Sequence, residues 1–222
     1  MITSRQFFSL GNFPQFATTH LPSPRFNDLR SIACLVQTQG FNGFSYADIS
    51  AQLGITKASL HYHFTTKADL GSTLIARYSA AFRRALDEID HSAPEAREKL
   101  RRYAGLYAQV LRQNRMCLCG MLAADYTTLP AEMRAGVKEF FDLNESWLAR
   151  VFEEGRKQGV LRFQGPPLDS ARLLLGSLEG AMLVARSYGD AERFTSAAQR
   201  LLAELSGSRK KPAGRTDRRL GR

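Results

Sequence analysis

The segment FSYADISAQLGITKASLHYHF, near the amino end of the chain, limits the possible folds more than any other feature of the sequence. Ser45, followed three residues later by Asp48, gives the capping-box pattern that begins a helix. Gly54 is suited to end that helix, because glycine readily adopts the left-handed conformation found after helix ends. Thr56 can cap the next helix only two residues later. The segment therefore predicts two short helices joined by a tight turn.

A second capping pattern, Thr66 with Asp69, opens a long helix that is expected to reach about Ile89. Apolar residues recur at helical spacing in most of the remaining chain, and no stretch shows the sustained alternation of a strand. Further helices are expected at residues 26–40, 95–113, 116–126, 130–158, 169–187 and 190–205. We therefore predict an all-α fold, in which a three-helix helix-turn-helix domain precedes a larger helical domain.

Four regions are expected along the chain. They are an irregular arm at 1–25, a helix-turn-helix domain at 26–71, a larger helical domain at 72–206 and a basic, disordered tail at 207–222. The tail contributes +6 of the formal net charge of +10, so the rest of the chain is only mildly basic. The tail could anchor the chain non-specifically to DNA, but blocks of like charge usually stay solvated, and we favour a solvated end.

The sequence lacks the motifs that are typical of several classes of enzyme and of metal-binding protein. The patterns G-x-S-x-G, H-E-x-x-H and G-x-G-x-x-G and the Walker loop are absent, so we expect neither an enzyme nor a cofactor. His61 and His63 do not share a helix face, so no metal site is expected. Cys34, Cys117 and Cys119 form no disulfide framework, and no apolar run approaches the roughly 18 residues that span a membrane. A cytoplasmic protein is expected.

Two residue patterns carry a resemblance to a known family. They are S-x-x-D-I-S-x-x-L-G-I, from Ser45 to Ile55, and K-A-S-L-H-Y-H-F-x-T-K-x-x-L, from Lys57 to Leu70. This combination resembles the helix-turn-helix of the TetR family of transcription regulators. The resemblance implies a sequence-specific repressor that a small-molecule inducer releases from a palindromic operator in double-stranded DNA. The alternative is a helical small-molecule carrier, or ligand buffer, whose helix-turn-helix does not function.

The resemblance also implies a role for individual residues of this segment. Lys57, Ala58 and Ser59 would face base edges in the major groove. The residues that would contact the phosphate backbone are Ser45, Tyr46, His61, Tyr62, His63 and Lys67. Independently of the resemblance, the helix that starts at Thr56 offers free backbone N–H groups and a positive dipole end to a phosphate. Ser45 and Thr56 are also adequate as caps alone, and Tyr62 could be a core aromatic, although we favour the phosphate.

The last two predicted helices carry more apolar surface than one chain can readily cover. In the TetR family such helices pair with those of a second copy in a four-helix bundle, so the resemblance implies a homodimer. The expected interface residues are Leu174, Leu178, Ala181, Leu183, Leu201 and Leu205. An ordinary core within one chain is the alternative.

An inducer pocket is expected among the helices between Arg97 and Gln158. Aromatic, methionine and cysteine side chains in this part of the chain suit an apolar or electrophilic small molecule. The candidate lining residues are Tyr103, Tyr107, Cys117, Met121, Phe140 and Trp147. Any one of them could instead belong to a plain core.

Cys117 lies in a stretch that resembles the electrophile-sensing members of the family, and it falls where their sensor cysteine stands. Arg112 and Arg115 lie close in the sequence, and a helix is expected to start near Met116. Both features are expected to lower the pKa of the thiol and favour the reactive thiolate. A buried, inert cysteine is the alternative and the commoner outcome.

Overall fold

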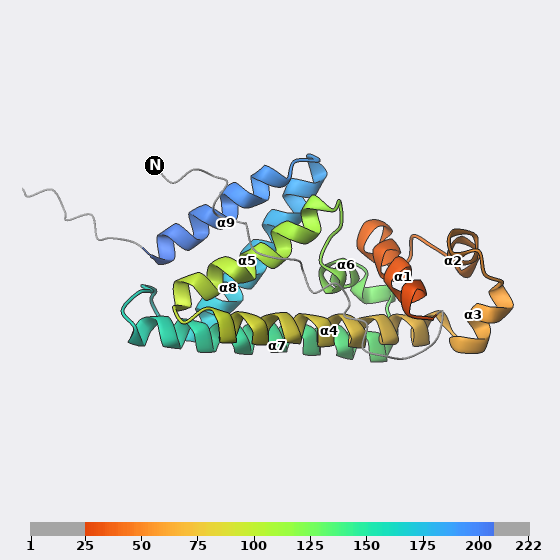
Figure 1. The fold of residues 1–222 in the computed structure, drawn as a ribbon, viewed down its shortest axis with the longest axis horizontal. Helices are drawn as coiled ribbons and strands as arrows, with labels where there is room; N and C mark the ends of the chain where they lie inside the picture. Colours follow the sequence, from red (N-terminus) through yellow and green to blue (C-terminus); the bar gives the residue numbers. More distant parts are fainter. Residues whose placement is uncertain (1–24, 207–222) are drawn as a thin grey trace, which may run out of the picture.

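The computed structural model describes residues 25–206, and these residues fold into nine α-helices and one short 3-10 helix, with no strand among them (Figure 1). In chain order the elements are α1 Arg25–Gln39, α2 Tyr46–Leu53, α3 Lys57–His63, α4 Lys67–Ser92, α5 Ala96–Arg112, α6 Leu118–Ala124, η2 Tyr126–Thr128, α7 Ala131–Lys157, α8 Pro167–Ser187 and α9 Ala191–Leu205. The prediction of an all-α fold is confirmed. No helix in this part of the chain is long and apolar enough to cross a membrane.

The helices form an elongated molecule with α1, α2 and α3 at one end (Figure 1). Helices α4 and α7 lie side by side along the length of the molecule, and α8 packs against both α7 and α9. Helix α6 lies between α1 and the rest of the larger domain. The long helix α4 therefore connects the small amino-terminal unit to the larger helical domain.

Helices α4 and α7 pack together because each carries one apolar stripe at helical spacing. The buried apolar residues of α4 include Leu70, Leu74, Ile75, Tyr78, Phe82, Leu86 and Ile89. Those of α7 include Met133, Val137, Phe140, Trp147, Leu148, Val151 and Phe152. Both stripes join one continuous core that also includes the amino-terminal unit.

The carboxyl end of α1 is bound to the larger domain by hydrogen bonds. The Gln37 amide Nε2 donates to Met116 O at 2.9 Å, and Met116 N donates to Gln37 O at 3.1 Å. Arg186 of α8 donates from Nη1 to Gln37 O at 2.9 Å and from Nη2 to Thr38 O. The last carbonyls of a helix lack partners within the helix, so donors from elsewhere can hold them. We call Gln37, Thr38, Met116 and Arg186 the α1 joint.

The loop between α1 and α2 is held in a similar way. Lys67 donates to the carbonyl oxygens of Phe41 and Phe44 at 2.5 Å each, and its ammonium lies 4.6 and 4.3 Å from the centroids of the two rings. Partial burial lowers the pKa of Lys67. Phe41 N donates to Asp125 Oδ2 at 2.8 Å, just after α6. The loop is therefore fixed both by the start of α4 and by the segment that follows α6.

Two helices begin or end at residues other than those expected, and two of the expected regions lie mostly outside the described residues. The helix expected at 116–126 covers only Leu118–Ala124, because Met116 N donates to Gln37 and Cys117 becomes the capping residue. Helix α1 begins at Arg25, within the region expected to be an irregular arm. The rest of that arm and the basic tail at 207–222 lie outside the described residues.

Removing the Arg186 side chain should loosen α1. Arg186→Ala leaves two helix-terminal carbonyls without a charged donor, so we expect the free energy of unfolding to fall by about 1–3 kcal/mol. Amide hydrogen exchange should also become faster at the end of α1 than elsewhere in the amino-terminal unit. Urea melts at a fixed protein concentration and exchange mass spectrometry measure the two effects.

Arg172→Ala is the matched control, because Arg172 lies on the same helix in an exposed ion pair with Glu145. Its stability should stay within about 0.5 kcal/mol of the wild type. Equal effects of the two substitutions would contradict a special role for the α1 joint.

Candidate DNA-binding surface and effector site

The turn between α2 and α3 forms as the capping residues predict. The Ser45 side chain accepts from the backbone N–H of Ala47 and Asp48, while the Asp48 carboxylate accepts from Ser45 N at 2.7 Å. The hydrogen bonds from Ser45 lower the pKa of Asp48. Gly54 ends α2 with a φ of +65°, in the left-handed region that glycine tolerates. Thr56 Oγ1 accepts from Ser59 N at 3.1 Å and begins α3. The two helices are thus set by their own caps.

Helix α3 turns Leu60 inward and most of its other side chains outward. Leu60 is 3% exposed and belongs to the same core cluster as Ile49. Tyr62 is 82% exposed, so the alternative that it is a core aromatic is wrong. The exposed residues of α3 are Lys57, Ala58, His61, Tyr62 and His63, and Ser59 is half-buried. The helix therefore offers polar and aromatic side chains to a partner rather than to its own core.

The other expected DNA-contact residues lie near α3 but also have partners within the chain. The Tyr46 hydroxyl donates to Phe64 O at 3.0 Å, and its ring centroid lies 4.7 Å from that of His61. Lys67 gives two of its three ammonium donors to Phe41 and Phe44, which leaves one for a phosphate. Ser45 and Thr56 are exposed and act as helix caps. Contacts of these residues with DNA stay predictions.

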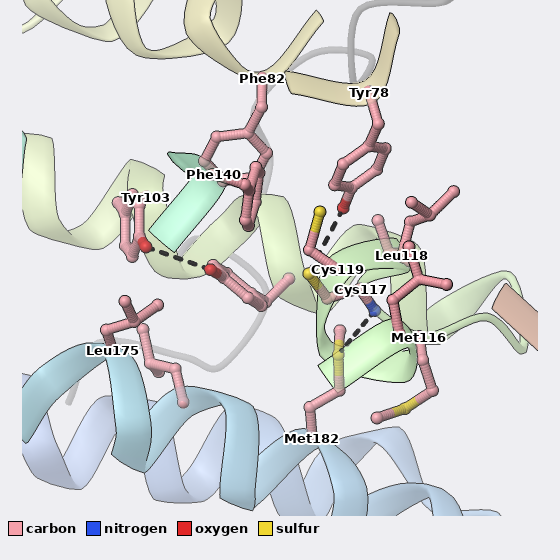
Figure 2. Packing of buried hydrophobic residues seen from close by; sticks show 14 of the residues in the cluster. Tyr78, Phe82, Tyr103, Met116, Cys117, Leu118, Cys119, Phe140, Leu175 and Met182 are labelled. Carbon is pink, nitrogen blue, oxygen red and sulfur yellow. Dashed lines mark hydrogen bonds between the residues drawn. The ribbon is translucent and has the colours of Figure 1, made fainter. Parts of the chain in front are cut away.

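Five of the six expected pocket residues belong to the buried core, and Met121 packs against it; Figure 2 shows Tyr103, Cys117 and Phe140. The Tyr103 hydroxyl donates to Asn144 Oδ1 at 2.8 Å and lies 3.1 Å from the Tyr107 hydroxyl. The ring of Trp147 stacks on that of Tyr103, with centroids 5.5 Å apart. All six candidates are buried except Met121, which is half-buried. The set therefore forms an aromatic core with a small number of hydroxyl groups inside it.

One surface groove touches this core. The groove runs between α4 and α7, has a volume of about 470 Å³ and includes Phe140 in its lining. The Phe140 ring centroid lies 5.5 Å from that of Tyr78 and 5.1 Å from that of Phe82. Phe140 therefore separates the groove from the aromatic core.

Two neutral hydrogen-bond donors contact the sulfur of Cys117. The Tyr78 hydroxyl donates to Cys117 Sγ at 3.7 Å (Figure 2), and Gly120 N donates to the same sulfur at 3.4 Å. Cys117 N donates to Met182 Sδ at 3.3 Å. Burial raises the pKa of Cys117 well above its ordinary value, and the Glu179 carboxylate raises it further. The thiol is therefore protonated at neutral pH.

The expected low pKa of Cys117 is wrong, because the arginines near it in sequence have other partners. The guanidinium of Arg115 donates to Cys34 Sγ at 3.3 Å and to Gln37 Oε1 at 3.1 Å. Arg112 donates to Ala108 O at 3.3 Å on its own helix. The start of α6 supplies one N–H to the sulfur, but burial outweighs this contribution.

Glu179 was not among the expected site residues. Its carboxylate is buried beside Cys117, with which it shares a hydrogen bond, and its Oε1 has no hydrogen-bond partner. Burial raises the pKa of Glu179 to about 7. The sequence does carry a signal for this site, because Glu179 is one acid within the apolar stretch LLLGSLEGAMLVA and lies at helical spacing from the buried Leu175 and Met182.

The expected dimer interface needs a correction. Leu174 and Leu178 are 3% and 0% exposed, because this side of α8 faces the chain's own core. The apolar side chains that α8 exposes lie on another side of the helix and include Leu173, Leu183 and Val184. Of the other expected interface residues, Leu183 is 60% exposed, and Ala181, Leu201 and Leu205 are half-buried. Sequence periodicity identified an apolar helix but not which of its two apolar faces is buried within one chain.

Comparisons with known proteins agree over most of the chain. Residues 29–71 match the model of bacterial regulatory proteins of the tetR family, and residues 96–201 match that of the tetracyclin repressor-like C-terminal domain. A TetR-family transcriptional regulator from Agrobacterium tumefaciens has a similar solved structure, with a TM-score of 0.79 and 32% sequence identity. The similarity covers 82% of this chain and 96% of that one.

Two characterised regulators are more distant relatives. The HTH-type transcriptional repressor NemR of Escherichia coli strain K12 is 26% identical over 175 residues, which cover 74% of this chain and 86% of NemR. The transcriptional regulator AcuR of Cereibacter sphaeroides is 29% identical over 154 residues, which cover 67% of this chain and 69% of AcuR.

Glu179 should make the stability of the protein depend on pH. In the unfolded chain this carboxyl has its ordinary pKa near 4.5, whereas burial raises the pKa to about 7 in the folded protein. As pH rises between these values, the unfolded chain releases the proton first, so the folded state loses stability. Glu179→Gln keeps the size of the side chain and removes this effect. The variant should gain roughly 2.5 kcal/mol relative to the wild type between pH 5 and pH 8.

Urea melts at fixed protein concentration and several pH values measure this difference. Glu192→Gln is the control, because Glu192 is an exposed carboxylate on α9. A stability difference between wild type and Glu179→Gln that does not change with pH would show that the carboxyl is not buried as described.

Proposed function

The chain belongs to the TetR family of bacterial regulatory proteins, and we propose on this premise that it is a transcriptional repressor which a small-molecule inducer releases from a palindromic operator. The observation that carries the proposal is the exposed helix α3, which is fixed by Thr56 and Leu60 and presents polar and aromatic side chains outward. A helix held in this way fits the major groove of B-DNA. A cytoplasmic location, where operator DNA is found, is part of the proposal.

We assign the DNA contacts by their position on this end of the molecule. Lys57, Ala58 and Ser59 lie in the first turn of α3 and would read base edges. The residues that would contact phosphates are Ser45, Tyr46, Thr56, His61, Tyr62, His63 and Lys67. Phosphate contacts would fix the position of the unit, and base contacts would give specificity.

A homodimer is the second element of the proposal, because a palindrome is read by two recognition helices related by a twofold axis. We place the interface on the exposed apolar face of α8, around Leu173, Leu183 and Val184. A side chain at Gly176 or Gly180 would meet nothing within 4 Å, so this face is open within one chain. Large exposed apolar side chains on one helix face favour an interface.

We place the inducer in the aromatic core of the larger domain. The proposed lining residues are Tyr103, Tyr107, Cys117, Met121, Phe140 and Trp147. An apolar ligand bound without a covalent bond suits this site better than capture of an electrophile, because the Cys117 thiol would first have to lose its proton in a buried site.

Release from DNA would follow from a shift between two dimer arrangements, one that fits the operator and one that does not. The inducer would bind the second arrangement more tightly. Helix α4 reaches from the core to α3, and the α1 joint ties the segment before α6 to α1. A coupling of about 1–3 kcal/mol changes operator occupancy roughly 5- to 150-fold.

Fluorescence anisotropy with DNA from upstream of the chain's own gene tests the proposal. The wild type should form a specific complex at moderate salt, and Lys57→Ala should weaken it by about 1–3 kcal/mol because a base contact is lost. Lys157→Ala is the control, since this exposed lysine ends α7 and forms an ion pair with Glu153 within its own helix. A single half-site should bind more weakly than the palindrome.

The alternative function, a ligand carrier with a non-functional helix-turn-helix, predicts a different outcome. No specific complex would form with any DNA at moderate salt, and Lys57→Ala would change only weak, salt-sensitive binding. That result would contradict the repressor.

A further inference from the structure

The carboxylate of Glu179 is the most unusual polar group in the core of the larger domain. Its Oε1 is buried and has no hydrogen-bond partner. Buried polar groups in folded proteins nearly always have a partner, and an exception calls for an explanation such as a bound molecule. Burial raises the pKa of Glu179, and the hydrogen bond from the Cys117 thiol lowers it. Neither influence comes from a cationic side chain, so Glu179 is not held in the core by an ion pair.

The surrounding backbone leaves room for this carboxylate. A methyl group added to Gly120 would overlap Glu179 Oε2, so the glycine in α6 is what allows the acid to lie there. Cys117 Sγ accepts from Gly120 N at 3.4 Å and from the Tyr78 hydroxyl at 3.7 Å, which fixes the thiol that shares a hydrogen bond with Glu179. The acid thus lies in a defined setting formed by α4, α6 and α8.

Aromatic rings and neutral hydroxyl or thiol groups lie near the acid, and Figure 2 shows Tyr78, Tyr103 and Cys117 among them. Burial raises the pKa of Tyr78, Tyr103 and Tyr107, and the charge of Glu179 raises each of them further, so all three tyrosines lie within its electrostatic reach. The rings of Tyr78, Phe82 and Phe140 pack against one another in the same core. A positive charge is attracted to aromatic faces as well as to a carboxylate.

We propose that Glu179, with Cys117 and Gly120 beside it, is an acidic subsite that receives the protonated amine of a small, otherwise apolar ligand. The inference rests on the proposed function, because it names the chemical class of the inducer. The ammonium group donates to Oε1, and the apolar part of the ligand packs among the aromatic rings. A neutral alcohol can donate one hydrogen bond to the same oxygen, but it brings no charge to offset that of the buried carboxylate.

The groove between α4 and α7 gives such a ligand a route. Phe140 lines the groove on one side and packs on Tyr78 and Phe82 on the other. Rotation of this single ring would open the groove toward Tyr78 and Phe82. Entry of the ligand would then press on α6, which lies next to the α1 joint.

The experiment compares four primary amines with the alcohols that have the same carbon skeletons. The amines are butylamine, hexylamine, benzylamine and phenethylamine. Thermal melts of the full-length protein at pH 8 report binding of each compound. At least one amine should raise the melting temperature more than its alcohol does. Glu179→Gln should weaken binding of that amine about tenfold or more, because a charge-assisted hydrogen bond is lost, and should leave the alcohol unchanged.

Glu192→Gln, on the exposed face of α9, is the matched control and should keep the preference for the amine. Gly120→Ala provides a second variant, because its methyl group would displace the carboxylate and should also weaken amine binding. The proposal is overturned if no amine stabilises the wild type more than its alcohol, or if the preference persists in Glu179→Gln.

The pH dependence of amine binding gives an independent readout. Affinity for the amine should rise between pH 6 and pH 8 as Glu179 loses its proton, while a primary amine stays protonated across this range, as lysine does. The titratable groups that face Glu179 all have a raised pKa and stay neutral; they are Tyr78 from α4, Tyr103 and Tyr107 from α5, and Cys117 and Cys119 from the α6 segment.

Operator binding without any amine separates this inference from the proposed function. Wild type and Glu179→Gln should both bind the operator when no amine is present, and an amine that binds should lower operator occupancy of the wild type alone. Intact operator binding together with no preference for amines would refute the acidic subsite and leave the repressor in place. Loss of specific DNA binding by the wild type would instead refute the repressor.

Discussion

The hydrogen bonds at the end of α1 are the constraint on which the rest of the structure depends. A helix end leaves carbonyl groups without partners, and here the donors that satisfy Gln37 and Thr38 come from Met116 and Arg186 of the larger domain. The position of α1 sets that of α2 and α3, because all three share one core. The larger domain therefore determines how the exposed helix α3 is presented.

The α1 joint and the acidic site lie one residue apart in the chain. Met116 exchanges hydrogen bonds with Gln37, and the next residue, Cys117, shares one with Glu179. A change in the core at Glu179 would reach α1 through this short segment, in addition to any movement along α4. Packed interiors are stiff, so a small displacement in the core is not absorbed within such a short connection.

Local capping chemistry made the amino-terminal unit predictable from sequence. Ser45 with Asp48, Gly54, Thr56, and Thr66 with Asp69 each act where expected, because a cap depends on residues only a few positions apart. The family resemblance and the inference of a DNA-binding regulator are confirmed by the comparisons. The pKa of Cys117 could not be predicted in the same way, because it depends on burial of the thiol by distant segments and on Glu179, a residue distant in sequence, while Arg115 turns toward Gln37. The buried face of α8 likewise depends on packing against α7 and α9, so the expected interface included the buried Leu174 and Leu178 beside the exposed Leu183.

Selection of fragmented genomic DNA by the purified protein, followed by sequencing and footprinting of the retained fragments, tests the central claim most directly. If α3 reads DNA from a symmetric dimer, the fragments will share an inverted repeat whose two protected half-sites lie about 34–36 Å apart, one turn of the double helix, or a multiple of that distance. Fragments with no common sequence, or protection that shows no twofold symmetry, would contradict the account.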